Sequence, residues 1–186
     1  MELLSAYCVN GRWLLQDDIH KQIMLDSLTF MVQENRIWLY GFVVLPNEFH
    51  LLWRKQPAWE LKNIRQMLLK FTAQQIKHRL KAVNRRELET YRTPKADRQF
   101  QFWERKSEVL VIASLTEAQE KLNIMHQMPV IAGCCERAED YRFSSAAFYR
   151  KDPINETAPK ATIQQAQGAE GPDVPALTHY NQHLPP

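Results

Sequence analysis

Glu48 and His50 form one pair of residues whose types and spacing suit metal binding. They lie two positions apart beside an apolar run, and side chains two apart on a β-strand point to the same face. A carboxylate and an imidazole held together are suitable ligands for Mg²⁺ or Mn²⁺. Two readings of the pair stay open: a two-ligand metal site, and a surface glutamate beside a partly buried histidine.

A segment rich in cations, from Leu61 to Arg86, is the second such feature, and we call it the basic segment. It contains eight Lys or Arg and no Asp or Glu, and because the whole chain carries +3, the rest of it carries −5. Cationic side chains bind nucleic-acid phosphates without selecting bases. The segment predicts a DNA-binding surface, with a solvated helix face as the alternative. Its cations are Lys62, Arg65, Lys70, Lys77, Arg79, Lys81, Arg85 and Arg86.

The residues around Glu48 have the patterns of two strands joined by a tight turn. Residues 37–45 and 49–53 are runs of aromatic and β-branched residues that only three residues separate. Further strands are expected at residues 3–9, 100–104 and 109–112.

Three stretches have the 3.6-residue periodicity of amphipathic helices, and the second of them overlaps the basic segment. Pro129 is expected to end the last helix, because proline cannot continue the backbone hydrogen bonding. Residues 87–99 predict a polar loop. The expected helices are 18–33, capped by Asp17 or Asp18; 59–82; and one from Ser114 or Thr116 to about His126.

In chain order these elements are strand, helix, strand, strand, helix, strand and helix. This order is typical of an α+β fold, and it predicts a ferredoxin-like (RRM-like) antiparallel sheet with helices packed on it, in a single domain. We place the domain at residues 1–150. Residues 151–186 contain six of the ten prolines and few apolar side chains, which predicts a flexible tail.

Composition argues against several classes of protein. At 45% hydrophobic and 24% charged residues the chain is ordinary for a globular domain, and no stretch approaches the roughly 20 apolar residues of a membrane span. Residues 1–10 lack the pattern of a secretory signal, so we expect a soluble, cytoplasmic protein. Three cysteines, two of them adjacent at Cys134 and Cys135, predict neither structural disulfides nor a cysteine zinc site.

The segment from Leu39 to Trp53, which reads LYGFVVLPNEFHLLW, resembles the strand-turn-strand of REP-associated tyrosine transposases and their insertion-sequence relatives. These are single-tyrosine enzymes of the His-hydrophobic-His class. Other segments resemble the same family in the same order along the chain. They are Gln101–Arg105 (QFWER), Gln119–Val130 (QEKLNIMHQMPV), Glu139–Ala146 (EDYRFSSA) and Leu177–Tyr180 (LTHY).

The resemblance implies a DNA transposase that nicks and joins single strands with Mg²⁺ or Mn²⁺. In such enzymes a helix tyrosine attacks a phosphodiester and forms a phosphotyrosine while a hydroxyl leaves, and the metal polarises the scissile phosphate. Ile124 matches this tyrosine, and Met128 matches a polar metal ligand one turn later. Glu48 and His50 match the histidine pair. Because the three departures concern one site, the resemblance implies a degenerate site that has lost cleavage.

The function implied is a transposase-family protein, a homodimer, that binds hairpin or single-stranded DNA. Two alternatives stay open: an active transposase that uses a divergent site, and a decaying gene product without selected activity. Tyr141 matches a structural motif of the family, so it is a poor substitute for the missing nucleophile. His126 lies about 200° around the helix from Ile124 and is expected to be a structural or surface histidine.

Overall fold

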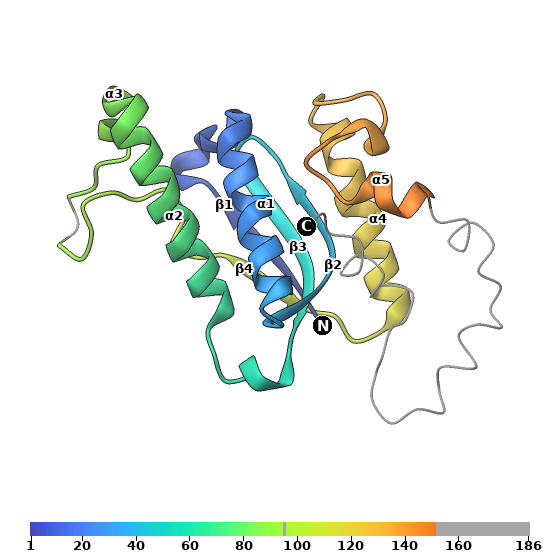
Figure 1. The fold of residues 1–186 in the computed structure, drawn as a ribbon. Helices are drawn as coiled ribbons and strands as arrows, with labels where there is room; N and C mark the ends of the chain where they lie inside the picture. Colours follow the sequence, from blue (N-terminus) through green and yellow to red (C-terminus); the bar gives the residue numbers. More distant parts are fainter. Residues whose placement is uncertain (95, 152–186) are drawn as a thin grey trace.

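The structure is a computed structural model that describes residues 1–94 and 96–151. In this part of the chain four strands form one antiparallel sheet with the order β2-β3-β1-β4 (Figure 1). That order confirms the expected ferredoxin-like class. The tail expected after Lys151, with the segment Leu177–Tyr180, lies outside the described residues. The strands are β1 (Glu2–Tyr7), β2 (Ile37–Val44), β3 (Glu48–Lys55) and β4 (Glu108–Val111).

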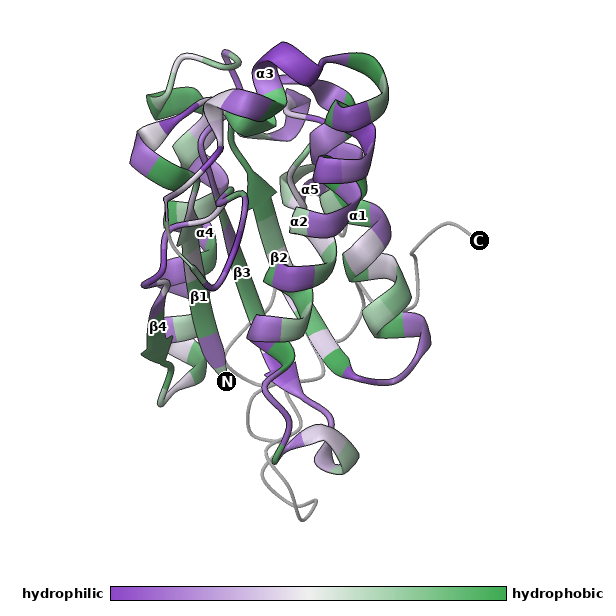
Figure 2. Cartoon of the chain, turned by 90° about the vertical axis from the view of Figure 1, so that its left-hand side faces the viewer, coloured by the Kyte–Doolittle hydropathy of each residue, from purple (hydrophilic) through white to green (hydrophobic). Residues whose placement is uncertain are grey.

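Helices cover both faces of the sheet. Figure 1 and Figure 2 show α1 and α2 on one face and α4 on the other, where α4 packs against β2 and β3. In the described ranges, none of the helices combines the length and the apolar character needed to cross a membrane. The helices are α1 (Asp18–Gln33), α2 (Ile64–Val83), α3 (Arg85–Thr90), α4 (Leu115–Ile131) and α5 (Ala146–Lys151).

Alternation along β3 assigns its side chains to the two faces. Gly41 of β2 pairs with Leu52 of β3, and a Cβ added at Gly41 would lie 2.3 Å from a methyl carbon of Leu122 on α4. Leu52 therefore faces α4, and so do His50 and Glu48. Phe49, Leu51 and Trp53 point the other way and are completely buried under α1 and α2.

Helix α1 and the hairpin follow the sequence closely. The predicted range 18–33 is the observed α1, and the Asp17 carboxylate caps it by accepting the Ile19 N–H. The segment expected at 59–82 begins later, at Ile64, because the side chain of Asn63 caps α2 by accepting the Gln66 N–H. The Ser114 hydroxyl caps α4 in the same way, with Glu117 as donor.

Three expectations were wrong. Pro129 lies inside α4, which continues to Ile131 and ends where Gly133 takes a φ of +69° that suits glycine. The expected strand at 100–104 forms only isolated bridges, because its pairing partners lie in irregular segments. Part of the expected loop at 87–99 is helical, since the side chain of Asn84 caps α3.

All three cysteines are free: Cys8 is buried, Cys134 is exposed and Cys135 is half-buried. The three thiols form no disulfide with one another in the structure.

Candidate functional site

Glu48 and His50 lie together at the start of β3, on the sheet face that carries α4. The Nε2 atom of His50 is 3.5 Å from the Glu48 carboxylate, and its Nδ1 atom is 2.8 Å from the Ser5 hydroxyl. Ser5 pairs with His50 across β1 and β3, so the register itself brings the two side chains together. The structure therefore brings together the two residues that the sequence analysis singled out.

The His50 ring is held in a defined orientation. Its side chain is 9% exposed, and Nε2 is buried without a hydrogen bond, because the Glu48 oxygen lies at ion-pair distance only. When the Nδ1–H bonds to Ser5, the Nε2 lone pair is directed at the space beside Glu48. An imidazole oriented by such a contact is a good metal ligand.

A complete metal centre does not form around this pair. Among residues 1–94 and 96–151, no three His, Cys, Asp or Glu side chains gather closely enough to hold a metal ion. Glu48 and His50 provide an oxygen and a nitrogen ligand, and structural metal sites commonly use four or more. The residues present therefore do not fit a tightly bound metal, and we derive no step that depends on one.

Tyr7 and Glu108 complete the polar cluster, and the sequence analysis missed both. The Tyr7 hydroxyl donates to the Glu108 carboxylate at 3.3 Å, and the Tyr7 ring meets the His50 ring edge-on at 6.3 Å between centroids. Burial, Glu108 and Glu48 raise the pKa of the Tyr7 phenol. At neutral pH the phenol keeps its proton and is a poor nucleophile. The sequence could have indicated Tyr7, because Ser5 and Tyr7 lie two positions apart on one strand and therefore share a face.

Ile124 and Met128 lie one turn apart on α4, on one flank of the helix. Ile124 is 58% exposed, and Met128 is half-buried against the core. Helix α4 contains no tyrosine or cysteine. Helix α4, on which the sequence resemblance places Ile124 and Met128, therefore offers neither a phenol nor a thiol.

His126 lies on the opposite flank of α4 and has a structural role, as the sequence predicted. Its Nε2 atom is 2.8 Å from the Ser145 hydroxyl, and its ring lies 5.3 Å from that of Tyr149, centroid to centroid. Ser145 also accepts the N–H of Phe42 at 3.0 Å, which ties this segment to β2. His126 therefore joins α4 to the segment before α5.

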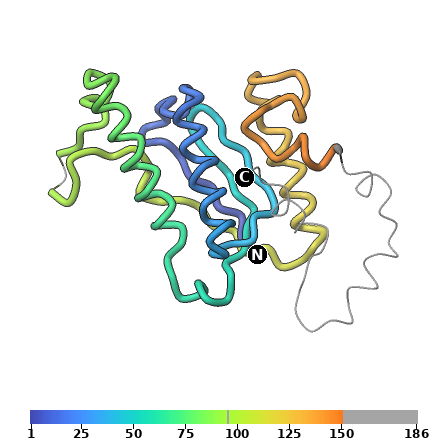
Figure 3. The backbone as a smooth tube through the Cα atoms, viewed as in Figure 1, coloured from blue at the N-terminus to red at the C-terminus, as the bar shows by residue number. Residues whose placement is uncertain are grey.

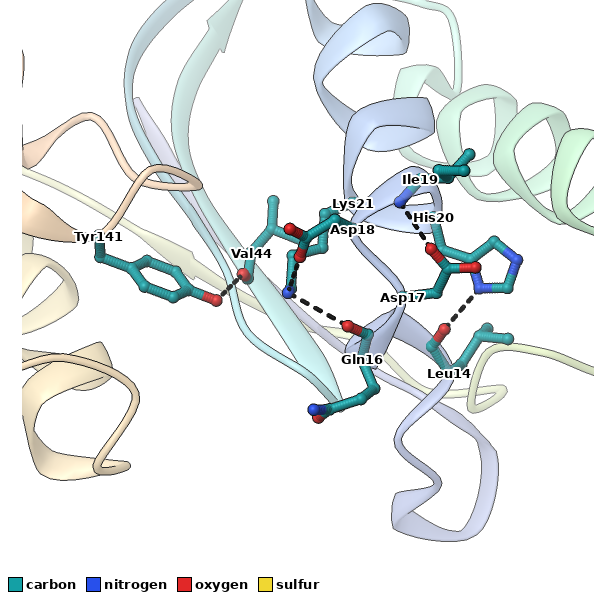
Figure 4. Close-up of polar contacts among 9 residues, drawn as sticks. All are labelled: Leu14, Gln16, Asp17, Asp18, Ile19, His20, Lys21, Val44 and Tyr141. Carbon is teal, nitrogen blue, oxygen red and sulfur yellow. Dashed lines mark hydrogen bonds and ion pairs between the residues drawn. The ribbon is translucent and has the colours of Figure 1, made fainter.

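Tyr141 and Tyr149 also serve the fold. Each hydroxyl donates to a backbone carbonyl of β2: Tyr141 to Val44 at 2.8 Å, and Tyr149 to Tyr40. Figure 4 shows the Tyr141 contact reaching across to β2. Burial raises the pKa of Tyr141 well above the ordinary value. Both phenols are engaged by backbone carbonyls of β2, in agreement with the structural reading of Tyr141.

His126 makes the stability of the fold depend on pH. Burial lowers its pKa to about 4, whereas the value in an unfolded chain is about 6.5. The unfolded chain takes up this proton first, so the stability from the neutral ring is present above pH ~6.5 and is lost as the pH falls towards ~4. One pKa unit corresponds to about 1.4 kcal/mol, which predicts a loss of about 3 kcal/mol.

This prediction is checked by urea unfolding of the wild type and His126→Gln between pH 7 and pH 4. Glutamine keeps a polar group beside Ser145 but does not titrate. We expect the two stability curves to converge as the pH falls. Parallel curves would contradict a neutral, buried His126.

The basic segment lies on the other side of the sheet from Glu48 and His50. Most of it forms α2, and its last cations continue into α3 (Figure 2). Among the described residues, only one of its eight cations pairs with a carboxylate, Arg79 with Asp17 at 3.1 Å. Lys77 lies over the ring of Phe100, 5.5 Å from its centroid. The other six, Lys62, Arg65, Lys70, Lys81, Arg85 and Arg86, make neither kind of contact within these residues.

Comparison with known proteins supports the fold. No family model and no curated protein matches the sequence. The structure described as that of the REP associates tyrosine transposase bound to a REP hairpin is similar, with a TM-score of 0.58 and 15% identity over 83% of this chain and 82% of that one. A putative transposase from Deinococcus radiodurans R1 is less similar, with a TM-score of 0.45 and 20% identity over 68% of this chain and 88% of that one. The chain therefore has the fold of a REP-associated tyrosine transposase.

Proposed function

We propose that the protein is a DNA-binding member of the transposase family that holds hairpin or single-stranded DNA and does not cleave it. The observation that carries this proposal is that α4, on which the resemblance places the nucleophile at Ile124, contains no tyrosine or cysteine. Unpaired cations on α2 and α3 support the binding half of the proposal. The neighbour's description names a hairpin as its ligand, which supports a hairpin here.

The binding half is tested by the salt dependence of affinity for a hairpin oligonucleotide. Each phosphate contact releases counterions, so the logarithm of the affinity should fall linearly with the logarithm of salt concentration. Six contacts would weaken binding by about 10³-fold between about 50 and 200 mM salt. Affinity that is absent, or that does not change with salt, would favour a decaying gene product.

An active transposase with a divergent site is the second candidate, and the free Nε2 atom of His50 beside Glu48 is the observation that favours it. Such an enzyme would need a nucleophile, and the phenols nearby are protonated or bonded to backbone carbonyls. We therefore place this candidate second. Cytoplasmic location and a homodimer remain expectations from the sequence.

Weak metal binding by Glu48 and His50 is a further expectation. We expect Mn²⁺ to bind with a dissociation constant weaker than about 0.1 mM, because two ligands are few for this cation. Electron paramagnetic resonance of free Mn²⁺ measures this, with Glu48→Gln as the variant and Glu120→Gln on α4 as the control. Equal binding by the wild type and Glu48→Gln would remove Glu48 from any metal site.

A further inference from the structure

Trp13 is the most exposed aromatic side chain in the described residues. It is 68% exposed, while the next two residues, Leu14 and Leu15, are completely buried. Single exposed aromatic side chains are common on protein surfaces, so exposure alone does not define a ligand site. Trp13 is a candidate binding residue because it lines a cavity together with two arginine side chains.

The backbone that carries Trp13 is firmly held. Leu15 donates its N–H to the Pro46 carbonyl at 2.8 Å, and the Leu14 carbonyl lies 2.7 Å from His20 Nδ1. Figure 4 shows the second contact, where the segment before α1 turns into the helix. An exposed side chain on a fixed backbone loses little freedom when it binds. Trp13 is in this sense pre-organised.

A cavity of about 470 Å³ opens beside Trp13, within the range of about 300–1,000 Å³ common for ligand sites. Its lining residues come from the segment after β1 and from the end of the basic segment with α3, and Figure 3 traces the backbone of both segments. Both segments contribute a guanidinium, from Arg12 and from Arg86. Tyr91 lies at the base, with the Arg12 guanidinium 5.2 Å from its ring centroid.

The other polar groups of the cavity are compatible with an anionic ligand. Glu87 also lines it, but the Asn84 amide donates to the Glu87 carboxylate at 3.0 Å, so that charge is partly satisfied. An indole beside two guanidinium groups is a combination that nucleotides fit, since a base stacks on the aromatic ring and a phosphate pairs with arginine.

We propose that this cavity, which we call the Trp13 pocket, binds one unpaired nucleotide of DNA. The base stacks on Trp13, and the neighbouring phosphates contact Arg12 and Arg86. Arg86 is also the last cation of the basic segment, so DNA held along that segment leads directly to the pocket. This inference rests on the proposed DNA binding and adds a site for the unpaired part of the ligand.

The test compares two hairpins with the same stem, one blunt and one with a short single-stranded extension, by fluorescence anisotropy with the full chain. Stacking on one aromatic ring contributes about 1–3 kcal/mol, so Trp13→Ala should bind the extended hairpin about tenfold more weakly. Its affinity for the blunt hairpin should not change. Trp13→Phe should recover most of the loss, because phenylalanine also stacks.

Phe30→Ala is the matched control, because it removes a half-exposed aromatic side chain on α1, outside the Trp13 pocket. A 2-aminopurine in the extension should be quenched by the wild type and by Phe30→Ala, and not by Trp13→Ala. If Trp13→Ala matches the wild type on the extended hairpin, the pocket assignment fails while DNA binding stands. If the wild type binds neither hairpin, the proposed function fails as well. Tighter binding of the same extension made of ribonucleotides would overturn the assignment to DNA.

Discussion

Replacing four exposed cations of the basic segment with glutamine should weaken hairpin binding by about 100-fold near 150 mM salt. Each lost phosphate contact removes close to one counterion from the equilibrium, so the salt slope should also become shallower by about 4. Anisotropy titrations over a range of salt concentrations measure both quantities. The four residues are Lys70, Lys81, Arg85 and Arg86.

The sheet supplies a matched control for this experiment, since it separates α2 from α4. A second variant replaces four cations outside the basic segment with glutamine. It loses the same amount of charge and should keep most of the affinity. Equal losses in the two variants would show that net charge, and not the α2 face, sets the affinity. A larger loss in the control would place DNA away from α2. The control residues are Arg54, Lys106, Lys121 and Arg142.

The second prediction concerns restoration of cleavage. The combined variant Glu48→His, Ile124→Tyr and Met128→Asn should form a covalent complex with single-stranded hairpin DNA in the presence of Mn²⁺. Ile124 is exposed, so a tyrosine fits there without displacing core side chains. Removing a nucleophile costs enzymes up to about 10⁶ in rate, and a partly rebuilt site should exceed a phenyl control by about 10³-fold.

That control replaces Ile124 with phenylalanine in the same background, which keeps the ring and omits the attacking oxygen. Denaturing gels detect the covalent complex, and thermal unfolding shows whether each variant is folded. A folded triple variant that forms no complex would mean that positions 48, 124 and 128 have been matched wrongly to the family.

Local signals in the sequence were sufficient for most of the fold. Asp17 and Ser114 are strong caps, and the apolar runs on either side of Pro46 could form little except a hairpin. The errors arose where a long-range contact or a competing cap decides the outcome. Pro129 fits inside α4 because it occupies the last turn, and Gly133, not the proline, ends the helix. No local sequence pattern shows which of these two residues ends the helix.

The site could be predicted only in part. Glu48 and His50 share a strand, so their proximity follows from alternation. Tyr7 and Glu108 are separated by 101 positions and meet because β1 pairs with β4, a register that the sequence does not reveal. Trp13 was not singled out because it precedes two leucines and looks like part of an apolar run. Its exposure depends on how that segment turns into α1.

The arrangement of the two chemical features also depends on the three-dimensional fold. The basic segment and the Glu48 pair are close in the sequence but lie on opposite faces of the sheet. Binding and cleavage would therefore use separate surfaces, and the loss of one does not require the loss of the other. This separation would allow the cations of α2 and α3 to persist in a protein that has lost cleavage, as we propose.

The central claim is that this protein binds hairpin DNA without cutting it, and one measurement tests it most directly. Wild-type protein is incubated with a labelled single-stranded hairpin and Mn²⁺, and the products are separated on native and denaturing gels. The account predicts a shifted complex on the native gel and intact, protein-free DNA on the denaturing gel. A covalent complex between protein and DNA would contradict it. Loss of that complex in Tyr7→Phe, or in a variant of any other residue, would identify the attacking group.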